Sequence, residues 1–486
     1  MDSKALPVKK TKIVCTIGPA CETPDILEQM IDSGMNIARL NFAHGDFESH
    51  RQVIKKIRAA AKKRGRRVAI MGDLPGPKMR IGHVDPEPLM LERGQTFTLQ
   101  AGDFVGDAQR ASMRFAGLAK AVKTGDKIFI NDGYIQLQVQ QVAGQEVRCL
   151  VLVGGELRSH KGVNFPGIDL GIRAFTDYDR KCLAFAAEQG LDAVSQSFVQ
   201  NGEDMTAVRQ AAAEMDFYPF LIAKIERAGA RDNLGNILDA SDGLMVARGD
   251  LGVEIPIETI AIAQKEIISQ ANLRGKPVIT ATHMLESMVE YPRPTRAEAT
   301  DVANAILDGT DCVMLSGETA VGNYPVESVA VMARIAQASE PHCLSSEIVE
   351  SLEHNRQSTH FDADKIISLI IHFSTTVCQP VAVIAPTITG RTARMIGRFR
   401  LPVWVVAVSP FEATCQSLQF SYGVYAVHEK ERPSDWEQYA RDWLVEYGIS
   451  GDMALLTQGS GTGQIGSTNK VGIIDLSKPM ADAVLW

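Results

Sequence analysis

The sequence lacks the features that mark several broad classes of protein. None of its 8 cysteines forms a Cys-x-x-Cys pair and several lie inside apolar runs, so we expect reduced core thiols rather than a disulfide frame or a zinc site. No apolar stretch reaches the ~18 residues of a membrane span, and the first residues are too polar for a secretory leader. The formal charge of −8 comes without a basic stripe, which argues against binding to nucleic acid or to an anionic membrane. These absences favour a cytoplasmic protein.

The composition that remains is that of an ordinary globular chain. Its 486 residues are 45% hydrophobic and 22% charged, and no tract of low complexity interrupts them. Because the length exceeds the roughly 250–300 residues of a single core, we predict two or three domains.

Short apolar runs alternate with helical patterns along much of the chain. Each run is compatible with a buried parallel strand. The predicted strands are 12–18, 38–42, 68–74, 193–198, 220–226, 243–249, 277–282 and 312–316, and the predicted helices are 23–33, 47–64, 202–214, 228–239, 258–274, 295–308 and 326–339. Such strand-helix units close naturally into a (β/α)8 TIM barrel.

Between residues 75 and 171 this alternation is interrupted. A Pro-Gly-Pro run follows Leu74, and the helical pattern resumes only after an expected N-cap at Thr176. In between, polar and apolar residues alternate over 96–99, 127–130 and 135–139, which predicts antiparallel β-sheet. We interpret this insertion as a β-barrel-like lid domain on Pro/Gly hinges.

Beyond residue 341 a charged stretch precedes a second alternation of strands and helices. Strands are predicted at 381–385, 403–408, 424–427, 453–456 and 471–476, a pattern typical of an open α/β domain. We therefore predict a barrel formed by 1–74 and 172–342, a lid formed by 75–171, and a C-terminal α/β domain formed by 343–486.

Two of the predicted strands end in acidic residues, Glu226 and Asp250. Parallel strands joined by a helix bring their carboxyl ends to one sheet edge, so we expect these carboxylates to form a site for a hard divalent cation. Lys224 lies two residues before Glu226 and therefore points to the same face. An ammonium beside a bound cation suits chemistry in which negative charge develops on oxygen or a phosphoryl group. A Lys-Glu surface ion pair is the simpler alternative.

Polar residues recur at the carboxyl ends of the other predicted strands. They are Arg39, Asn41, Asp73, Thr282, Ser316 and Glu318. Barrel enzymes collect catalytic groups at these positions, although any one of them could instead be a structural hydrogen-bonding residue.

Several longer runs, taken together, resemble the pyruvate kinase family. They are NIARLNFAHG (36–45), GPKMR (76–80), KGVNFPG (161–167), KIE (224–226), DGLMVARGDLGVEIP (242–256), ATHMLESM (281–288), PTRAE (294–298) and MLSGETA (314–320), in the family's order. The resemblance implies transfer of a phosphoryl group from phosphoenolpyruvate to ADP, which gives pyruvate and ATP. It also implies a homotetramer.

The resemblance further implies roles for residues of the barrel. Glu226 and Asp250 resemble the ligands of the Mg²⁺ or Mn²⁺ that holds phosphoenolpyruvate, and Lys224 resembles the lysine that steadies the transferring phosphoryl group and the enolate. Gly249, Asp250 and Thr282 resemble the cradle for the substrate carboxylate. Thr282 also lies near the family's proton-delivery path, for which Ser316 and Glu318 are further candidates.

Five residues are similar to the family's phosphate and nucleotide contacts: Arg39, Asn41, His44, Arg80 and Lys161. Arg39 is also expected to bind phosphoenolpyruvate and take part in catalysis. Arginine forks and lysine point charges suit phosphate oxygens. Because Lys161 follows most of the lid insertion, lid closure could bring it onto ADP and exclude water.

At the monovalent-cation site the sequence departs from the family pattern. Many members bind K⁺ through Asn, Ser, Asp and Thr and carry Glu in a Gly-Pro-Glu run, whereas the residues here are Asn41, Ala43, Asp73, Leu74 and Lys78. We expect Lys78 to lie near Asn41 and Asp73 and to supply the charge of K⁺, so that K⁺ is not required. The alternative is a solvent-facing Lys78 with a cation site elsewhere.

The run PTITGRT (386–392) follows a predicted strand of the C-terminal domain. Its amides and hydroxyls suit a phosphate nest, although an ordinary N-cap needs only one hydroxyl. The matching family loop holds a sugar-phosphate effector, which makes Thr387, Thr389, Gly390, Arg391 and Thr392 a candidate allosteric site. The second family loop, at 458–469 here, has neither Arg nor Trp. A monophosphate sugar, a nucleotide or no effector are therefore alternatives to fructose 1,6-bisphosphate.

Two other functions are compatible with parts of this pattern. A metal-dependent lyase or aldolase acting on pyruvate-like oxyacids would use the two carboxylates but would not need Arg80, Lys161 or a lid, so ADP binding separates it from a kinase. A sensor of phosphorylated metabolites would be expected to have lost Lys224 or a metal acid, and both are present.

Overall fold

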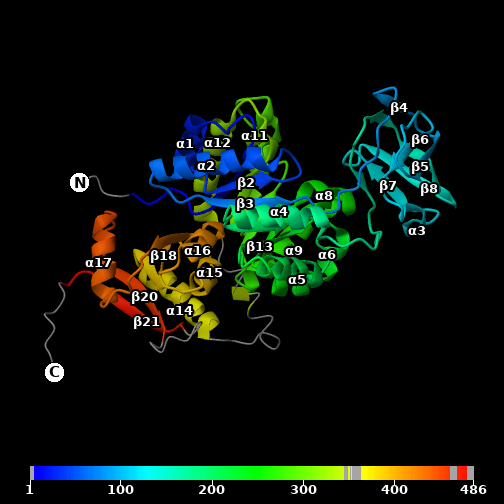
Figure 1. Ribbon diagram of the computed structural model, residues 1–486. Helices are drawn as coiled ribbons and strands as arrows, with labels where there is room; N and C mark the ends of the chain where they lie inside the picture. The colour runs from blue at the N-terminus through cyan, green and yellow to red at the C-terminus, as the bar shows by residue number, and fades with distance from the viewer. Residues whose placement is uncertain (1–4, 344–348, 351, 353–362, 460–467, 479–486) are drawn as a thin grey trace.

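The computed structural model describes residues 5–343, 349–350, 352, 363–459 and 468–478. Within them a parallel β-sheet closes into a barrel, in the order β1-β16-β15-β14-β13-β12-β3-β2 (Figure 1). Its strands are β1 (Lys12–Thr16), β2 (Ile37–Asn41), β3 (Ala69–Leu74), β12 (Ala193–Gln196), β13 (Phe220–Ile225), β14 (Gly243–Ala247), β15 (Val278–Ala281) and β16 (Cys312–Leu315). The predicted TIM barrel is thereby confirmed.

Helices surround the barrel strands and connect them. They are α1 (Pro24–Ser33), α2 (Phe47–Lys63), α4 (Asp177–Glu188), α5 (Gly202–Ala213), α6 (Ala228–Asp232), α7 (Leu234–Ala240), α8 (Arg248–Glu254), α9 (Ile260–Leu273), α10 (Arg296–Leu307), α11 (Gly317–Ala320) and α12 (Pro325–Ser339), with 3-10 turns η1 (Ile257–Thr259), η2 (Glu286–Val289) and η3 (Glu340–His342). The expected N-cap at Thr176 is confirmed, because its side chain and that of Asp179 form a capping box at α4.

Two sequence predictions about the barrel were wrong in detail. The single helix expected at 228–239 is split into α6 and α7 at Asn233, whose φ of −101° and ψ of 11° are not helical. The strand expected at 243–249 ends at Ala247, so Asp250 lies in the first turn of α8 rather than on a strand. The partial positive charge at a helix start favours an acid there.

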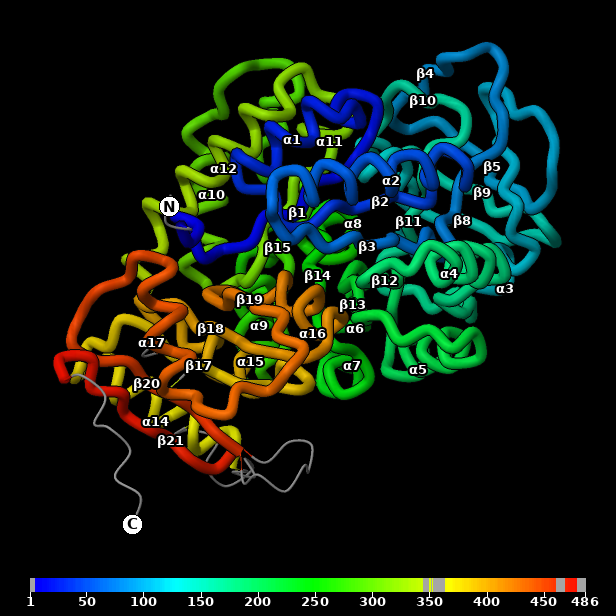
Figure 2. Tube along the Cα trace, turned by 60° about the vertical axis from the view of Figure 1, so that its left-hand side comes forward, coloured from blue at the N-terminus to red at the C-terminus, as the bar shows by residue number. Residues whose placement is uncertain are grey.

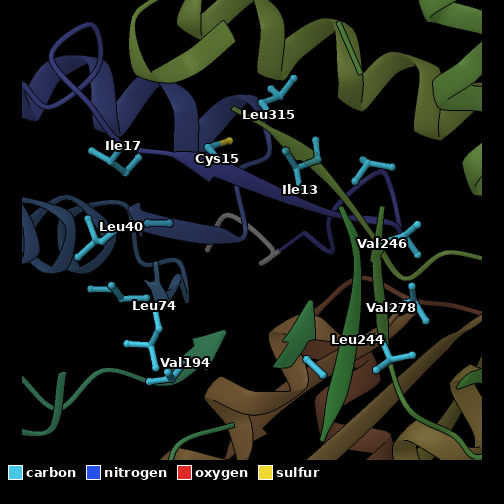
Figure 3. Close-up of a cluster of buried hydrophobic side chains, with 14 of the residues drawn as sticks. Ile13, Cys15, Ile17, Leu40, Leu74, Val194, Leu244, Val246, Val278 and Leu315 are labelled. Atoms are coloured by element: carbon cyan, nitrogen blue, oxygen red, sulfur yellow. The ribbon is translucent and has the colours of Figure 1, made fainter. Parts of the chain in front are cut away.

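Alternation along the strands separates two layers of side chains. One set packs between strands and helices, as the labelled Ile13, Cys15 and Leu40 do in Figure 3. The other set, which includes Val14, Ile37 and Met71, fills the barrel interior. Towards the carboxyl ends the same inward rows become polar, and this change of character places the candidate site at one end of the barrel.

The insertion forms a separate mixed domain that projects from one side of the barrel (Figure 1). Its elements are β4 (Leu89–Leu91), β5 (Thr96–Ala101), β6 (Arg110–Met113), α3 (Leu118–Ala121), β7 (Lys127–Ile130), β8 (Ile135–Ala143), β9 (Glu146–Val153), β10 (Gly155–Leu157) and β11 (Val163–Asn164). The main sheet has the order β11-β7-β8-β9-β5-β6. The expectation of a purely antiparallel sheet was wrong, because β5 and β6 pair in parallel. An antiparallel bridge between Arg80 and Gly162 joins the outgoing and returning segments.

The C-terminal domain is an open α/β sheet with the strand order β19-β18-β17-β20-β21. Its elements are α14 (Ala363–Cys378), β17 (Ala382–Pro386), α15 (Arg391–Gly397), β18 (Trp404–Ser409), α16 (Glu412–Ser417), η4 (Leu418–Phe420), β19 (Val424–His428), α17 (Trp436–Glu446), β20 (Met453–Gly459) and β21 (Thr468–Asp475). Strand β21 runs antiparallel to β20, and the other pairs are parallel. No helix in the described ranges is long and apolar enough to span a membrane.

The lid and the C-terminal domain lie at opposite sides of the barrel, as Figures 1 and 2 both show. A buried ion pair joins the C-terminal domain to the barrel. Arg400 Nη1 lies 2.9 Å from Oδ1 of Asp311, which directly precedes β16. The C-terminal domain therefore covers the amino end of the barrel and leaves the carboxyl end to the lid. The residue limits predicted for the three domains stay predictions.

Candidate active site

Lys224 lies at the centre of a polar cluster at the carboxyl end of the barrel. Its ammonium is 2.9 Å from Glu226 Oε1, donates to Ser197 Oγ at 2.6 Å and is 3.4 Å from the carboxylate of Asp73. Burial disfavours the charged form, but Asp73 and Glu226 more than offset that effect and raise the pKa of Lys224. The side chain is therefore a fixed positive charge at the barrel mouth, and the alternative of a surface ion pair is wrong because Lys224 is only 8% exposed.

Asp73 organises the cations of this cluster. Its Oδ2 accepts a hydrogen bond from Arg39 Nε at 3.0 Å, and its Oδ1 accepts one from Ser195 Oγ at 2.7 Å. Arg39 in turn donates from Nη1 to Thr16 Oγ1 at 2.9 Å. Burial alone would raise the pKa of Asp73, but the charges of Lys224 and Arg39 hold it below its ordinary value. Asp73 thus holds two cationic side chains side by side.

The surroundings of Glu226 and Asp250 are compatible with the predicted cation site. Glu226 is 2% exposed and its Oε2 accepts a hydrogen bond from the amide of Phe198 at 2.7 Å. Burial raises the pKa of Glu226, and the negative charge of Asp250 raises it further. The positive charge of Lys224 lowers this pKa but does not offset the other two effects. Two carboxylates that repel each other at the mouth of a barrel fit a divalent cation, because Mg²⁺ needs few protein carboxylates beside substrate oxygens and water.

The short helix α8 and the turn after β15 form one unit. Gly249 donates its amide to Thr282 Oγ1 at 2.7 Å, and Thr282 donates to the carbonyl of Ala281 at 2.6 Å. Thr282 has a φ of 69°, which is unusual for a β-branched residue. The structure thus brings Gly249, Asp250 and Thr282 together, with the Gly249 amide already bonded to the threonine.

Glu318 has a structural contact that explains its burial. Its carboxylate accepts hydrogen bonds from the amides of Leu285 at 3.0 Å and Ser316 at 2.6 Å, and it is fully buried. It therefore joins the segments that follow β15 and β16. Ser316 Oγ is buried and has no partner among the described residues, which leaves its hydroxyl able to bond a water or a substrate.

The residues predicted to contact nucleotide lie at the base of the lid and on the loop after β2. Arg80 is exposed and donates to the carbonyl of His160 at 3.0 Å, and its pairing with Gly162 places it beside Lys161. Asn41 Oδ1 accepts a hydrogen bond from the amide of Ala43 at 3.1 Å, while His44 is exposed. Arg80 and Lys161 are brought together, whereas His44 contacts His50 within the described part of the chain.

Lys78 has a different partner from the one expected. Among the described residues its ion-pair partner is Asp250, with Nζ 3.5 Å from Oδ1, whereas Asp73 is already bound by Arg39, Ser195 and Lys224. The side chain of Lys78 is 35% exposed. Its ammonium therefore lies beside a candidate metal ligand, and within the described ranges no hydrogen bond or ion pair joins it to Asn41 or Asp73.

The candidate effector loop in the C-terminal domain is partly bonded to itself. Gly390, with a φ of 79°, donates its amide to Thr387 Oγ1 at 2.9 Å, and the amide of Arg391 is 3.4 Å from Thr389 Oγ1. Arg391 Nε lies 2.9 Å from a carboxylate oxygen of Asp364. Thr392 is buried with its hydroxyl 2.7 Å from that of Thr468, so it faces inward. Of the second loop, 460–467 lie outside the described residues.

Sequence reasoning missed three side chains of the site: Ser195, Ser197 and Thr16. Ser195 and Ser197 continue the inward row that begins with Ala193, so alternation along this strand could have identified them. Thr16 occupies the corresponding inward position of β1, two residues after Val14. These three hydroxyl side chains are uncharged hydrogen-bond partners of the charged groups. No charge in the sequence therefore drew attention to them.

The barrel, the inserted domain beside its carboxyl end and the cluster of acids and cations at that end together suit a phosphotransferase of the barrel class. The chain matches the family described as "Pyruvate kinase, barrel domain" over residues 8–329 and the one described as "Pyruvate kinase, alpha/beta domain" over residues 364–474. It belongs to the pyruvate kinase family, whose members generally use Mg²⁺.

Individual relatives agree over nearly the whole chain. A pyruvate kinase of Thermococcus litoralis is 43% identical over 478 residues, which cover 97% of this chain and 99% of the relative. A pyruvate kinase of Clostridium acetobutylicum is 40% identical over 476 residues, with 96% and 100% covered. One of Geobacillus stearothermophilus is 42% identical over 483 residues, with 97% of this chain and 81% of the relative covered.

Proposed function

We propose that this chain transfers the phosphoryl group of phosphoenolpyruvate to ADP in the cytoplasm, with Lys224 as the central electrostatic group. The observation that carries the proposal is the buried ammonium of Lys224, held between Asp73, Glu226 and Ser197 at the barrel mouth. A fixed positive charge there stabilises negative charge as it develops on the phosphoryl group and the enolate. Arg39, locked by Asp73 and Thr16, is placed to bind a phosphate oxygen.

Glu226 and Asp250 are the side chains that we propose hold Mg²⁺ or Mn²⁺. When bound, the cation would neutralise the two acids and polarise substrate oxygens. The amides of Gly249 and Asp250 and the hydroxyl of Thr282 bind the substrate carboxylate, and Thr282 delivers the proton to the enolate carbon. Asn41, His44, Arg80 and Lys161 contact ADP when the lid closes, which would exclude water from the reacting phosphoryl group.

We propose that the enzyme does not require K⁺. Two of the family's K⁺-ligand positions hold Ala43 and Leu74, which offer no side-chain oxygen, and the acid at a third, Asp73, is saturated by protein donors. The ammonium of Lys78 supplies a positive charge beside Asp250 instead.

Pyruvate formation from phosphoenolpyruvate, ADP and Mg²⁺ in buffer free of K⁺, Na⁺ and NH₄⁺ tests both the reaction and this role of Lys78. We expect full activity without K⁺, and less than a twofold gain when K⁺ is added. Lys78→Glu should make activity depend on K⁺, whereas Lys181→Glu, an exposed residue of α4, should not. Activity of the unmodified enzyme only with K⁺ would refute the role of Lys78, and no activity in either buffer would refute the kinase function in favour of the lyase.

We propose that the chain forms a homotetramer in which one contact uses α14. Ile366, Ile370, Phe373 and Val377 are 44–80% exposed and recur at helical spacing, so they form one apolar stripe. The opposite face of α14 packs in the core through Ile367 and Ile371. Edge strand β21, which packs beside α14, exposes Ile473. An apolar stripe of this kind suits a two-fold contact with the same stripe of a second copy.

Light scattering tests this contact. Phe373→Glu is expected to halve the mass of the assembly, because a charge would be buried twice across a two-fold contact. Tyr218→Glu, at an exposed aromatic residue of the barrel, should leave the mass unchanged. An unchanged tetramer in the Phe373 variant would place the contact elsewhere.

We propose that a phosphorylated metabolite regulates the enzyme at the loop 387–391. Supporting this are the exposed Thr389 and Arg391 beside the turn at Gly390. Arg391 already pairs with the carboxylate of Asp364, so a phosphate that binds Arg391 must displace this carboxylate. Thr389→Ala with Arg391→Ala should abolish activation by glucose 6-phosphate, ribose 5-phosphate or AMP, whichever is active, and retain the rate at saturating substrate. Persistent activation would move the site away from this loop.

A further inference from the structure

Arg248, the first residue of α8, makes more polar contacts than any role assigned so far requires. Its guanidinium is 11% exposed and reaches β15, α9 and α10 at once. Nε lies 3.3 Å from the carbonyl of Ala281, and Nη2 donates to the carbonyl of Thr282 at 2.9 Å. One planar group thus binds two successive carbonyls at the end of the barrel strand.

These two carbonyls belong to a strained turn. Thr282 and the following His283 both have left-handed backbones, with φ of 69° and 53°. A β-branched residue rarely adopts this conformation, and it persists only where the surroundings hold it. The guanidinium of Arg248 supplies such a constraint, because its N–H groups contact the carbonyls of both Ala281 and Thr282.

The guanidinium is itself held in place from the far side. Asp301 on α10 accepts from Nη1 at 2.7 Å, and Gln264 Oε1 on α9 lies 3.3 Å from the same nitrogen. Asp301 balances the charge of Arg248, and the two acceptors fix the plane of the group. Movement of the turn after β15 would therefore break a network that spans three elements.

The turn carries the hydroxyl of Thr282, the proposed proton donor. Thr282 Oγ1 accepts the amide hydrogen of Gly249 at 2.7 Å, next to the candidate metal ligand Asp250. The position of this oxygen follows from the backbone of Thr282, since χ1 of a threonine offers few choices. Arg248 thus fixes where the hydroxyl lies relative to α8, and it does so through the backbone of the turn.

We propose that Arg248 is a positioning residue for proton transfer to the enolate carbon. The inference rests on the proposed role of Thr282. In that step the Thr282 hydroxyl turns from the carbonyl of Ala281, to which it donates in this structure, towards the enolate. The electron pair of the enolate C=C bond then takes its proton to form the new C–H bond. The enolate oxygen becomes the carbonyl of pyruvate, and solvent returns a proton to Thr282. Phosphoryl transfer precedes this step and does not use the Thr282 proton, so we expect Arg248 to affect it less than proton transfer.

The two half-reactions can be measured separately. Exchange of the pyruvate methyl protons with deuterium from D₂O, followed by NMR in the presence of Mg²⁺ and ATP, reports proton transfer at carbon. ATP formed from phosphoenolpyruvate and ADP in a single turnover reports phosphoryl transfer. Arg248→Lys keeps the charge but loses the fork, and we expect it to slow exchange at least tenfold while the single-turnover rate falls less than threefold.

Matched variants decide between the outcomes. Asp301→Asn should slow exchange in the same selective way but less, and Arg231→Lys, which weakens another pair between a barrel helix and α9, should change neither rate. Equal losses of both rates in Arg248→Lys would overturn the inference, since a merely structural role affects both. If Thr282→Ala exchanges normally, the proposed role of Thr282 fails and the inference with it. If Thr282→Ala is slow and Arg248→Lys is normal, only the inference fails.

Discussion

Replacement of Lys224 by methionine is expected to lower kcat by about 10³-fold while the affinities for Mg²⁺ and phosphoenolpyruvate stay within a few-fold. Methionine has nearly the length of lysine but brings no charge to the point where the phosphoryl group and enolate become negative. The loss therefore falls on the transition state more than on the bound substrate. Steady-state and single-turnover rates, with Mn²⁺ binding measured in parallel, check this expectation.

A second, half-buried lysine provides the control for this substitution. Lys276 donates to the carbonyl of Ser241 at 2.7 Å and has its pKa lowered by burial, but it lies before β15 at the other end of the barrel. Lys276→Met should retain kcat. An unchanged kcat in Lys224→Met would show that the ammonium of Lys224 has no part in the chemistry.

Replacement of Asp73 by asparagine is expected to reduce the free energy of unfolding by about 3–5 kcal/mol at pH 7, because two buried cations lose their shared counter-charge. Arg39 would remain within the barrel with only neutral acceptors, and Lys224 would keep only one of its two carboxylate partners, Glu226. We also expect activity to fall by about 10²-fold or more, since we propose that both cations bind the phosphoryl group. Urea unfolding and the initial rate measure the two effects.

The pH dependence of this difference has a definite sign. The pKa of Asp73 in the folded protein lies below its ordinary value of 3.8, so its stabilising effect is complete above that value and is lost as the pH falls through the folded pKa. The gap in stability between the two proteins should therefore narrow below about pH 4.

Removal of a single neutral partner gives the matched control. Ser195→Ala deletes one hydrogen bond to Asp73 and should cost only about 1 kcal/mol. A loss of less than 1 kcal/mol in Asp73→Asn, or a gap that is the same at pH 3 and pH 7, would mean that Asp73 is not the counter-charge of this cluster.

Local pattern was sufficient to predict the barrel strands, the closed barrel and most of the longer helices around it. Alternation of apolar and polar residues is a property of a few neighbours, and a strand such as β13 keeps it whatever the rest of the chain does. The same reasoning placed Lys224 and Glu226 on one face and at the carboxyl edge, because strand geometry alone decides that direction.

Interruptions of regular structure were harder to predict. The break between α6 and α7 at Asn233 and the early end of β14 at Ala247 both fall where the local pattern continues. A propensity is a weak preference, and the packing of an element against its neighbours readily overrides it.

The partner of each charged side chain depended on the closed barrel. Asp73 meets Lys224 across 151 positions of sequence, and Lys78 meets Asp250 across 172, so no local pattern reports either contact. The left-handed turn at Thr282 and its attachment to Arg248 likewise need β14, β15, α9 and α10 in place. Residue types and periodicity along the chain thus predict which groups reach the mouth of the barrel, whereas closure of the sheet determines which of them touch, because hydrogen bonds and ion pairs require approach to about 3 Å.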